Sequence, residues 1–196
     1  GFGFEHFWER SVNYAVAAVM TTARVRPDIS HSIFTTALLQ DIGAAIVVRY
    51  LPVAYGYALG MAEERKVHPV HGEREVMATD HAEVGAVLAE KWNLPPAMHV
   101  PIRYHHFSEF QDELDPSTAD GQTAETVKLI QISNLIVDAL VPGEDGEPAG
   151  VPEEIKERVA EMVGLELDDV AEIVAALPDE IERVRLLFRA ESDMAE

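Results

Sequence analysis

Leu38-Leu39-Gln40-Asp41-Ile42-Gly43-Ala44-Ala45-Ile46 is the stretch that most constrains the fold, because it places one carboxylate among mostly apolar residues. The segment around it, residues 31–50, is apolar almost all round, and a helix of that kind is usually buried on most sides. Burying an unpaired carboxylate costs several kcal/mol, so Asp41 requires a hydrogen-bonding partner or a metal ion. Gly43 costs roughly 1 kcal/mol relative to alanine inside a helix, which predicts that another backbone or side chain packs closely against it.

Helical periodicity extends outward from this stretch in both directions. Apolar residues recur at steps of three and four, and no segment shows the alternation typical of a strand. Asp80 is a predicted N-cap, because its carboxylate can accept hydrogen bonds from the free N–H groups of the next turn. The predicted fold class is therefore all-α. The predicted helices cover residues 5–24, 31–50, 52–65, 73–77, 81–92, 94–106, 123–141, 153–163, 168–177 and 179–190.

Composition divides the chain into a main domain and an appendage. Residues 1–141 form the predicted helical domain, and residues 142–152, PGEDGEPAGVP, read as a linker. We expect the helices of residues 153–190 to pack back on the main body through their apolar stripe. Residues 191–196 are expected to fray.

Charge and composition exclude several classes of protein. The 196 residues carry a formal net charge of −20 and contain no cysteine, which excludes disulfides and thiolate metal sites and opposes binding to nucleic acid. No run approaches the roughly 18 apolar residues of a membrane span, and the first residues lack the pattern of a signal peptide. We therefore expect a cytoplasmic protein that contacts neither nucleic acid nor a membrane.

Three histidines lie at the ends of predicted helices. His81 begins one helix, and His105 and His106 end another. Together with a carboxylate such as Asp41, histidine is the usual ligand of Fe, Mn, Ni or Zn. These segments need not meet in space, and each histidine taken alone is more often a structural residue. Adjacent helical residues point about 100° apart, so the sequence leaves open which of His105 and His106 faces the cleft.

A combination of short segments resembles the second half of an HDOD domain, a bacterial signalling domain similar to HD-type metal phosphohydrolases. Order and spacing agree over about residues 4–140. The resemblance implies a compact HD-type helical bundle with a small C-terminal helical extension. Domains of this family usually carry a further helical half before the Phe-Trp segment, so the resemblance implies either a fragment of a longer protein or an absent front half. We expect the surface that this half would cover, on the first helices, to drive homodimerisation. The segments are Phe7-Trp8-Glu9-Arg10-Ser11, residues 38–43, Glu75, Thr79-Asp80-His81-Ala82-Glu83-Val84-Gly85, Trp92-Asn93-Leu94-Pro95 and Ile102-Arg103-Tyr104-His105-His106.

Several positions depart from the metal-binding pattern that the resemblance implies. Arg10 and Gln40 stand where the pattern has histidines, and Asn134 stands where it has an aspartate, although Asp138 lies one turn later. The ligands that remain are Asp41, His81, His105 and His106. Losing several ligands lowers metal affinity by orders of magnitude.

These departures predict a degenerate metal site with no catalytic residue and no required cofactor. We expect Asp41 to pair with Arg10, or to bond to His81 or His106. If the residual site is occupied, Fe, Mn, Ni or Zn is the candidate ion.

The leading hypothesis is a non-enzymatic module of signal transduction. It would bind a signalling protein, an attached sensor or output domain, or a nucleotide-like ligand. The alternative is a metal-dependent phosphohydrolase or phosphodiesterase acting on a nucleotide or cyclic dinucleotide, with Asp138 as a further ligand. A third hypothesis is a structural dimerisation domain within a larger sensor.

Overall fold

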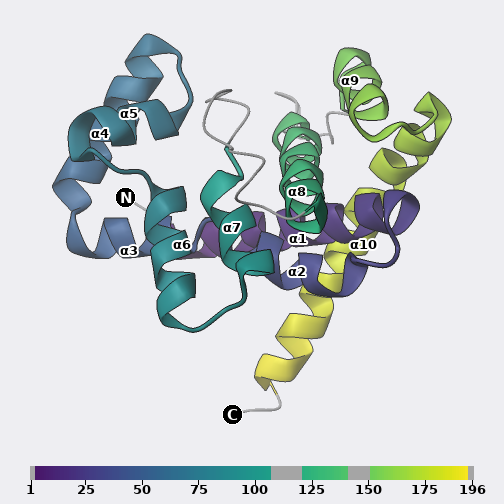
Figure 1. Ribbon diagram of the computed structural model, residues 1–196, viewed down its shortest axis with the longest axis horizontal. Helices are drawn as coiled ribbons and strands as arrows, with labels where there is room; N and C mark the ends of the chain where they lie inside the picture. Colours follow the sequence, from purple (N-terminus) through teal and green to yellow (C-terminus); the bar gives the residue numbers. More distant parts are fainter. Residues whose placement is uncertain (1–2, 107–120, 141–150, 194–196) are drawn as a thin grey trace.

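The structure is a computed structural model that describes residues 3–106, 121–140 and 151–193, with the backbone alone for residues 30, 31 and 190–193. Every regular element in these ranges is a helix, so the all-α prediction is confirmed (Figure 1). The helices are α1 Phe4–Val25, α2 Ser30–Leu39, α3 Ile42–Tyr50, α4 Pro52–Arg65, α5 Pro69–Met77, α6 His81–Lys91, α7 Pro96–Tyr104, α8 Gly121–Ala139, α9 Glu153–Val163 and α10 Leu167–Asp193.

Helix α1 is the axis of the core. Its apolar face packs against α2, α8 and α10, and Val12 and Val16 are fully buried there. The same cluster contains Ile132 and Ile136 of α8 and Leu177 of α10. The C-terminal helices therefore share one hydrophobic core with α1 and α8.

The predicted single helix at residues 31–50 is wrong, because the chain breaks at Gln40 and Asp41. Asp41 has φ −95° and ψ 7° and precedes the first residue of α3. The break turns α3 onto α6, where Gly43 meets the neighbouring backbone. A Cβ at Gly43 would collide with the carbonyl oxygen of His81 and the amide nitrogen of Gly85, which confirms the predicted close contact.

The same break interrupts Ser32–Tyr50, the only stretch in the described residues that is long and apolar enough to cross a membrane. It comprises most of α2, the break at Gln40 and Asp41, and α3, and the two helices have 10 and 9 residues. Each is shorter than the roughly 20 residues that a bilayer requires.

Helices α5, α6 and α7 carry the remaining side chains of the site. The predicted cap of α6 is confirmed, because Asp80 accepts a hydrogen bond of 2.9 Å from the backbone N–H of Glu83. Helix α5 begins at Pro69 and not at residue 73 as predicted, since Pro69 occupies the first turn and the His68 side chain accepts from the N–H of Val70 at 3.4 Å.

The C-terminal part contains one helix where two were predicted. Helix α10 runs through Pro178, which removes one internal hydrogen bond. Leu177 and Ile181 on either side of the proline are both buried against α1, and this packing keeps the helix continuous. Of the predicted linker, Val151 and Pro152 are described and Val151 is buried. Residues 141–150 and the terminal residues 194–196 lie outside the described part.

Candidate metal centre

Four side chains from three elements converge at one end of a cavity. Asp41 precedes α3, His81 begins α6, and His105 and His106 follow α7. One ligand atom of each lies within 4.8 Å of all the others. The structure thus brings together all four predicted ligands, and both His105 and His106 face the cluster.

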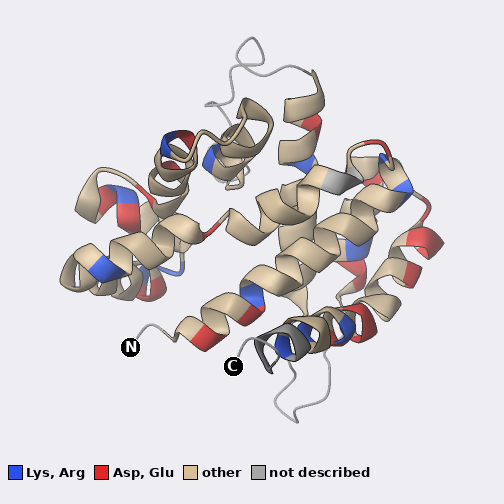
Figure 2. Cartoon of the chain, turned by 90° about the horizontal axis from the view of Figure 1, so that it is seen from below, with Lys and Arg blue, Asp and Glu red and all other residues tan. Residues whose placement is uncertain are grey.

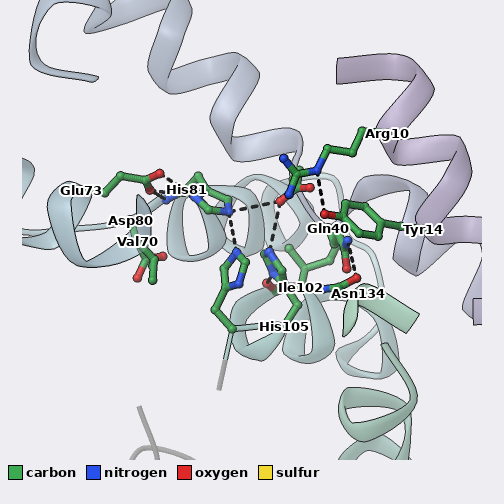
Figure 3. A network of polar contacts seen from close by, with 12 residues as sticks. Arg10, Tyr14, Gln40, Val70, Glu73, Asp80, His81, Ile102, His105 and Asn134 are labelled. Atoms are coloured by element: carbon green, nitrogen blue, oxygen red, sulfur yellow. Dashed lines mark hydrogen bonds and ion pairs between the residues drawn. The ribbon is translucent and has the colours of Figure 1, made fainter. Parts of the chain in front are cut away.

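A buried carboxylate that the sequence did not reveal holds His81 in place. Glu73 of α5 is fully buried, and it accepts the Nδ1–H of His81 at 2.8 Å and the backbone N–H of His81 at 2.7 Å. With Nδ1 engaged, the Nε2 atom of His81 points at the cluster, 3.2 Å from Asp41 Oδ1 and 3.0 Å from His106 Nε2. Figure 3 shows Glu73 beside His81, on the side away from His105.

His105 is oriented in the same way by a backbone group. Its Nδ1 lies 2.7 Å from the carbonyl oxygen of Ile102 and donates its proton to it. Its Nε2 is 3.2 Å from Asp41 Oδ1. In metal sites, a histidine ligand usually donates its other ring N–H to a carboxylate or a backbone carbonyl, and this bond directs the ligating nitrogen at the metal. His81 and His105 have this arrangement, with Nδ1 as the donor and Nε2 directed toward Asp41.

The orientation of these histidines requires a cation or a proton between the rings and the carboxylate. A neutral histidine that donates through Nδ1 presents a lone pair at Nε2. His81 and His105 would then each turn a lone pair toward Asp41, which is also an acceptor. A divalent ion bound by all of these atoms removes the conflict, and so does a proton on Nε2. The donor set therefore fits a transition metal ion.

Shifts in pKa show how the cluster is charged in the absence of an ion. Burial lowers the pKa of His81, but its bonds to Asp41 and Glu73 outweigh burial and raise the pKa to about 10. Burial raises the pKa of Asp41, and the bonds from His105 and His81 overcome this and hold the pKa well below its usual range. Burial, reinforced by the neighbouring histidines, holds the pKa of His106 far below its usual value. A proton on His81 thus lies where a metal ion would bind.

On the other side of Asp41, the departing residues bond mainly to one another, but the buried Gln40 Oε1 has no hydrogen-bond partner among the described residues. The Gln40 amide donates to Asn134 Oδ1 at 2.9 Å in the interior. Arg10 donates to the Tyr14 hydroxyl at 2.7 Å, and Tyr14 donates to Asp138 at 2.6 Å. Arg10 also pairs with Asp138 at 3.2 Å. Figure 3 shows Arg10, Tyr14, Gln40 and Asn134 together, apart from Glu73 and His81.

The bonds of Asp41 agree with one of the alternatives predicted for it. Asp41 was expected to pair with Arg10 or to bond to His81 or His106, and within the described residues it bonds to His81 and to His105. Asp138 is not among the grouped ligand atoms, because Arg10 and Tyr14 engage it at the half-exposed mouth.

Glu73 was missed because nothing local marks it. The acidic residue in the quoted resemblance was Glu75, which lies on the surface and pairs with Arg65. Glu73 is recognisable only from its contact with His81, eight residues later in the chain. A cavity of about 610 Å³ joins both sides, and its lining includes Arg10, Tyr14, Gln40, Asp41, His81 and Asn134.

Comparison with known proteins gives one family and several structural relatives. The HDOD domain model matches residues 1–108. A curated relative, an uncharacterised protein of Treponema pallidum, is 30% identical over 73 residues, which are 37% of this chain and 14% of that protein.

Among solved structures, the chain is similar to the MmoQ response regulator of Methylococcus capsulatus strain Bath, with 24% identity and a TM-score of 0.65 over 88% of this chain and 62% of that one. A Shewanella amazonensis protein classed provisionally as a phosphohydrolase has 20% identity and a TM-score of 0.69, over 92% and 62%. An HDOD domain protein of unknown function from Geobacter sulfurreducens has 20% identity and a TM-score of 0.64, over 92% and 60%. At these identities the structures establish the HD-type fold alone.

Proposed function

This chain belongs to the HDOD family, and we propose that it is a regulatory module whose cleft binds a single divalent transition metal ion and hydrolyses no substrate. One observation carries the proposal. On one side of Asp41 the metal-ligating residues His81, His105 and His106 are assembled, and on the other side Gln40 and Asn134 bond to each other.

The residues that would hold the ion are Asp41, His81, His105 and His106. A bound ion would supply positive charge and a link between helices. Glu73 keeps the Nδ1 proton of His81, and the Ile102 carbonyl keeps that of His105. Because the ligands come from the starts of α3 and α6 and the end of α7, binding ties these three segments together. An ion that binds only the folded state raises its stability by mass action, which is a means of regulation.

The opposite side of the cavity argues against hydrolysis. A two-metal phosphohydrolase requires ligands for a second cation to stabilise the attacking and leaving oxygens. In this chain, the part of the cavity where a second cation would lie is lined by the neutral amides of Gln40 and Asn134 and by the permanent charge of Arg10. Amide oxygens and nitrogens are poor ligands for transition metals compared with imidazole and carboxylate.

A signalling role is supported by the family and by the relatives. One structural relative is a response regulator, and another, from Marinobacter aquaeolei, is named as a signal transduction protein. This chain spans 62% of the first and 38% of the second. We infer that it acts on an attached sensor or output domain or on a signalling partner, in the cytoplasm.

The second candidate is a metal-dependent phosphohydrolase with one ion. The observation that favours it is the cavity of about 610 Å³, which opens onto the four-ligand cluster and leaves room for a small substrate. One ion can activate a bound water, so activity must be measured directly.

The test is the metal content of the full chain, purified without chelator or histidine tag, by inductively coupled plasma mass spectrometry. The expected result is close to one Fe, Mn, Ni or Zn ion per chain, lost in Asp41→Ala. Asp138→Asn is the matched control, because this carboxylate lines the same cavity outside the ligand group. The control should retain the ion.

The loaded protein is then assayed with bis(4-nitrophenyl) phosphate and with a cyclic dinucleotide. We expect no turnover above that of Asp41→Ala. A folded wild-type protein without bound metal refutes the metal centre. Metal-dependent turnover that disappears in Asp41→Ala replaces the proposal with the phosphohydrolase.

A further inference from the structure

The outer face of α4 combines bulky apolar side chains with two glycines. Val53, Gly56, Tyr57 and Gly60 follow the helical spacing of one face, and all four are exposed. Val53 is 85% exposed and Tyr57 is 68% exposed. We call these four residues the α4 face.

Both glycines cost helix stability for no reason found within the described chain. Glycine in mid-helix is less stable than alanine. At Gly43 and Gly72 a neighbouring backbone explains the absence of a side chain, because a Cβ would collide with it. At Gly56 and Gly60 a Cβ would meet nothing described within 4 Å. A close approach from outside the molecule would explain them.

The surroundings of the α4 face carry almost no charge. Tyr50 and Leu51, 75% and 51% exposed, continue it into a shallow depression of about 570 Å³ that also includes Val53 and Tyr57. From residue 42 to residue 62 the only charged residue is Arg49, in a chain with 35 Asp and Glu. Figure 2 shows acidic residues on many other parts of the ribbon.

We propose that the α4 face is a homodimer interface in which α4 packs antiparallel against α4 of a second copy. The face is complementary to itself, because Val53 and Tyr57 project while Gly56 and Gly60 leave a hollow beside them. In a two-fold interface the same patch must serve both copies. Close helix crossings occur where small residues let two backbones approach. Gly56 and Gly60 lie symmetrically about the middle of α4, so each would face the partner's other glycine.

Charge favours a second copy as the occupant. Two chains of net charge −20 repel each other. Contact through the α4 face keeps this repulsion low, because the four residues at the centre of the interface carry no charge. Antiparallel packing brings the turn that carries Arg49 toward the end of the partner helix that carries Glu64. Both residues are exposed.

The surface originally expected to drive dimerisation is different. Phe4 and Trp8 of α1 are 60% and 45% exposed, but Trp8 packs edge-on against Phe188 of α10, and Glu5 and Glu9 flank it. Among the described residues no ring packs on the α4 face, and the carboxylates nearest to it in α4, Glu63 and Glu64, lie at the C-terminal end of the helix. The α4 face shares no residue with the four-ligand cluster.

The test is sedimentation of the full chain with chelator present, from about 1 to about 100 μM. Wild type should form a dimer in this range. The double variant Gly56→Ala/Gly60→Ala should raise the unfolding temperature of the monomer by a few degrees, because alanine favours the helix and meets nothing. It should also weaken the dimer at least about tenfold, because two added methyl groups hold the helices apart.

Tyr57→Glu provides a second disruption and should yield a monomer with native circular dichroism. Val87→Glu on α6 is the matched control, since Val87 is also exposed, at 40%, and lies outside the α4 face; this variant should dimerise like wild type. A wild-type monomer throughout the range overturns the proposal, as does a dimer that both α4 variants leave intact.

Discussion

Replacing Glu73 by glutamine tests the buried charge on which the orientation of His81 depends. Glutamine preserves the shape of the side chain and removes its negative charge. Glu73 is fully buried and accepts two hydrogen bonds from residue 81. Oε2 accepts both bonds, and Oε1 lies 2.9 Å from the same Nδ1, so glutamine, with a single oxygen, turns an N–H group toward one of these contacts. The variant should therefore lose stability even when metal is chelated.

The size of the loss follows from the pKa of His81. Burial opposes protonation, yet bonds to Asp41 and Glu73 raise the pKa from 6.5 to about 10. At about 1.4 kcal/mol per pH unit, this corresponds to about 5 kcal/mol in favour of the imidazolium. Asp41 and Glu73 both contribute to this stabilisation of the imidazolium, and we assign about half of it to Glu73. Glu73→Gln should therefore lower the free energy of unfolding by about 2 to 3 kcal/mol at pH 6.

The loss should depend on pH in one direction. A histidine whose pKa is higher in the folded state contributes stability that is fully present below its unfolded pKa of 6.5. This contribution disappears as pH rises from 6.5 through about 10. At pH 10 the difference between variant and wild type should therefore shrink to about 1 kcal/mol, the contribution of the bond to the backbone N–H.

Urea denaturation followed by circular dichroism, in chelator at pH 6, 8 and 10, measures this difference. Glu75→Gln is the control, because Glu75 forms an exposed pair with Arg65; it should cost less than about 1 kcal/mol at each pH. No deficit for Glu73→Gln at pH 6 would refute the buried ion pair. An equal deficit at pH 6 and pH 10 would show that Glu73 acts only as a hydrogen-bond acceptor.

Two further predictions follow from the same site. The triple variant Arg10→His/Gln40→His/Asn134→Asp should bind about two metal ions per chain in place of about one, since it supplies imidazole and carboxylate ligands beside Asp41; an unchanged metal content would show that these positions do not face a second ion. Gly43→Ala should lower the free energy of unfolding by about 3 kcal/mol in urea denaturation, because its methyl group overlaps the backbone of α6. Gly121→Ala, where the space is open, should not be destabilised, and a stable Gly43→Ala would contradict the close contact.

The sequence predicted which four polar side chains come together, and it predicted the path of the chain less well, for reasons that differ by residue. Periodicity located most helices because each has one buried stripe. Periodicity did not predict the break at Gln40 and Asp41, because apolar residues continue on both sides of it. The turn there depends on Gly43 reaching the backbone of His81, a contact between residues far apart in sequence.

Side-chain partners were harder to predict than ligands. His81, His105 and His106 are recognisable because few residue types bind transition metals. Glu73 resembles any surface glutamate until its burial is known. Asp41 was expected to pair with Arg10 or to bond to His81 or His106, and it bonds to His81. The Arg10 guanidinium bonds instead to Tyr14, one turn along α1, and to Asp138 at the end of α8.

The two sides of the cavity differ in what they need in order to be stable, and this difference argues for one retained ion. Gln40 and Asn134 form one hydrogen bond between neutral amides, which requires no cation, although the buried Gln40 Oε1 has no partner among the described residues. The opposite side has three Nε2 atoms directed at a carboxylate and at one another, with His81 and His106 only 3.0 Å apart. Such a group is stable only with a proton or a metal ion at its centre. Burying three histidines beside a carboxylate is costly unless a proton or an ion links their lone pairs to it, because each buried polar group must find its partner within the group. Their retention, together with the buried Glu73 that directs His81 inward, is what a site built for one ion requires.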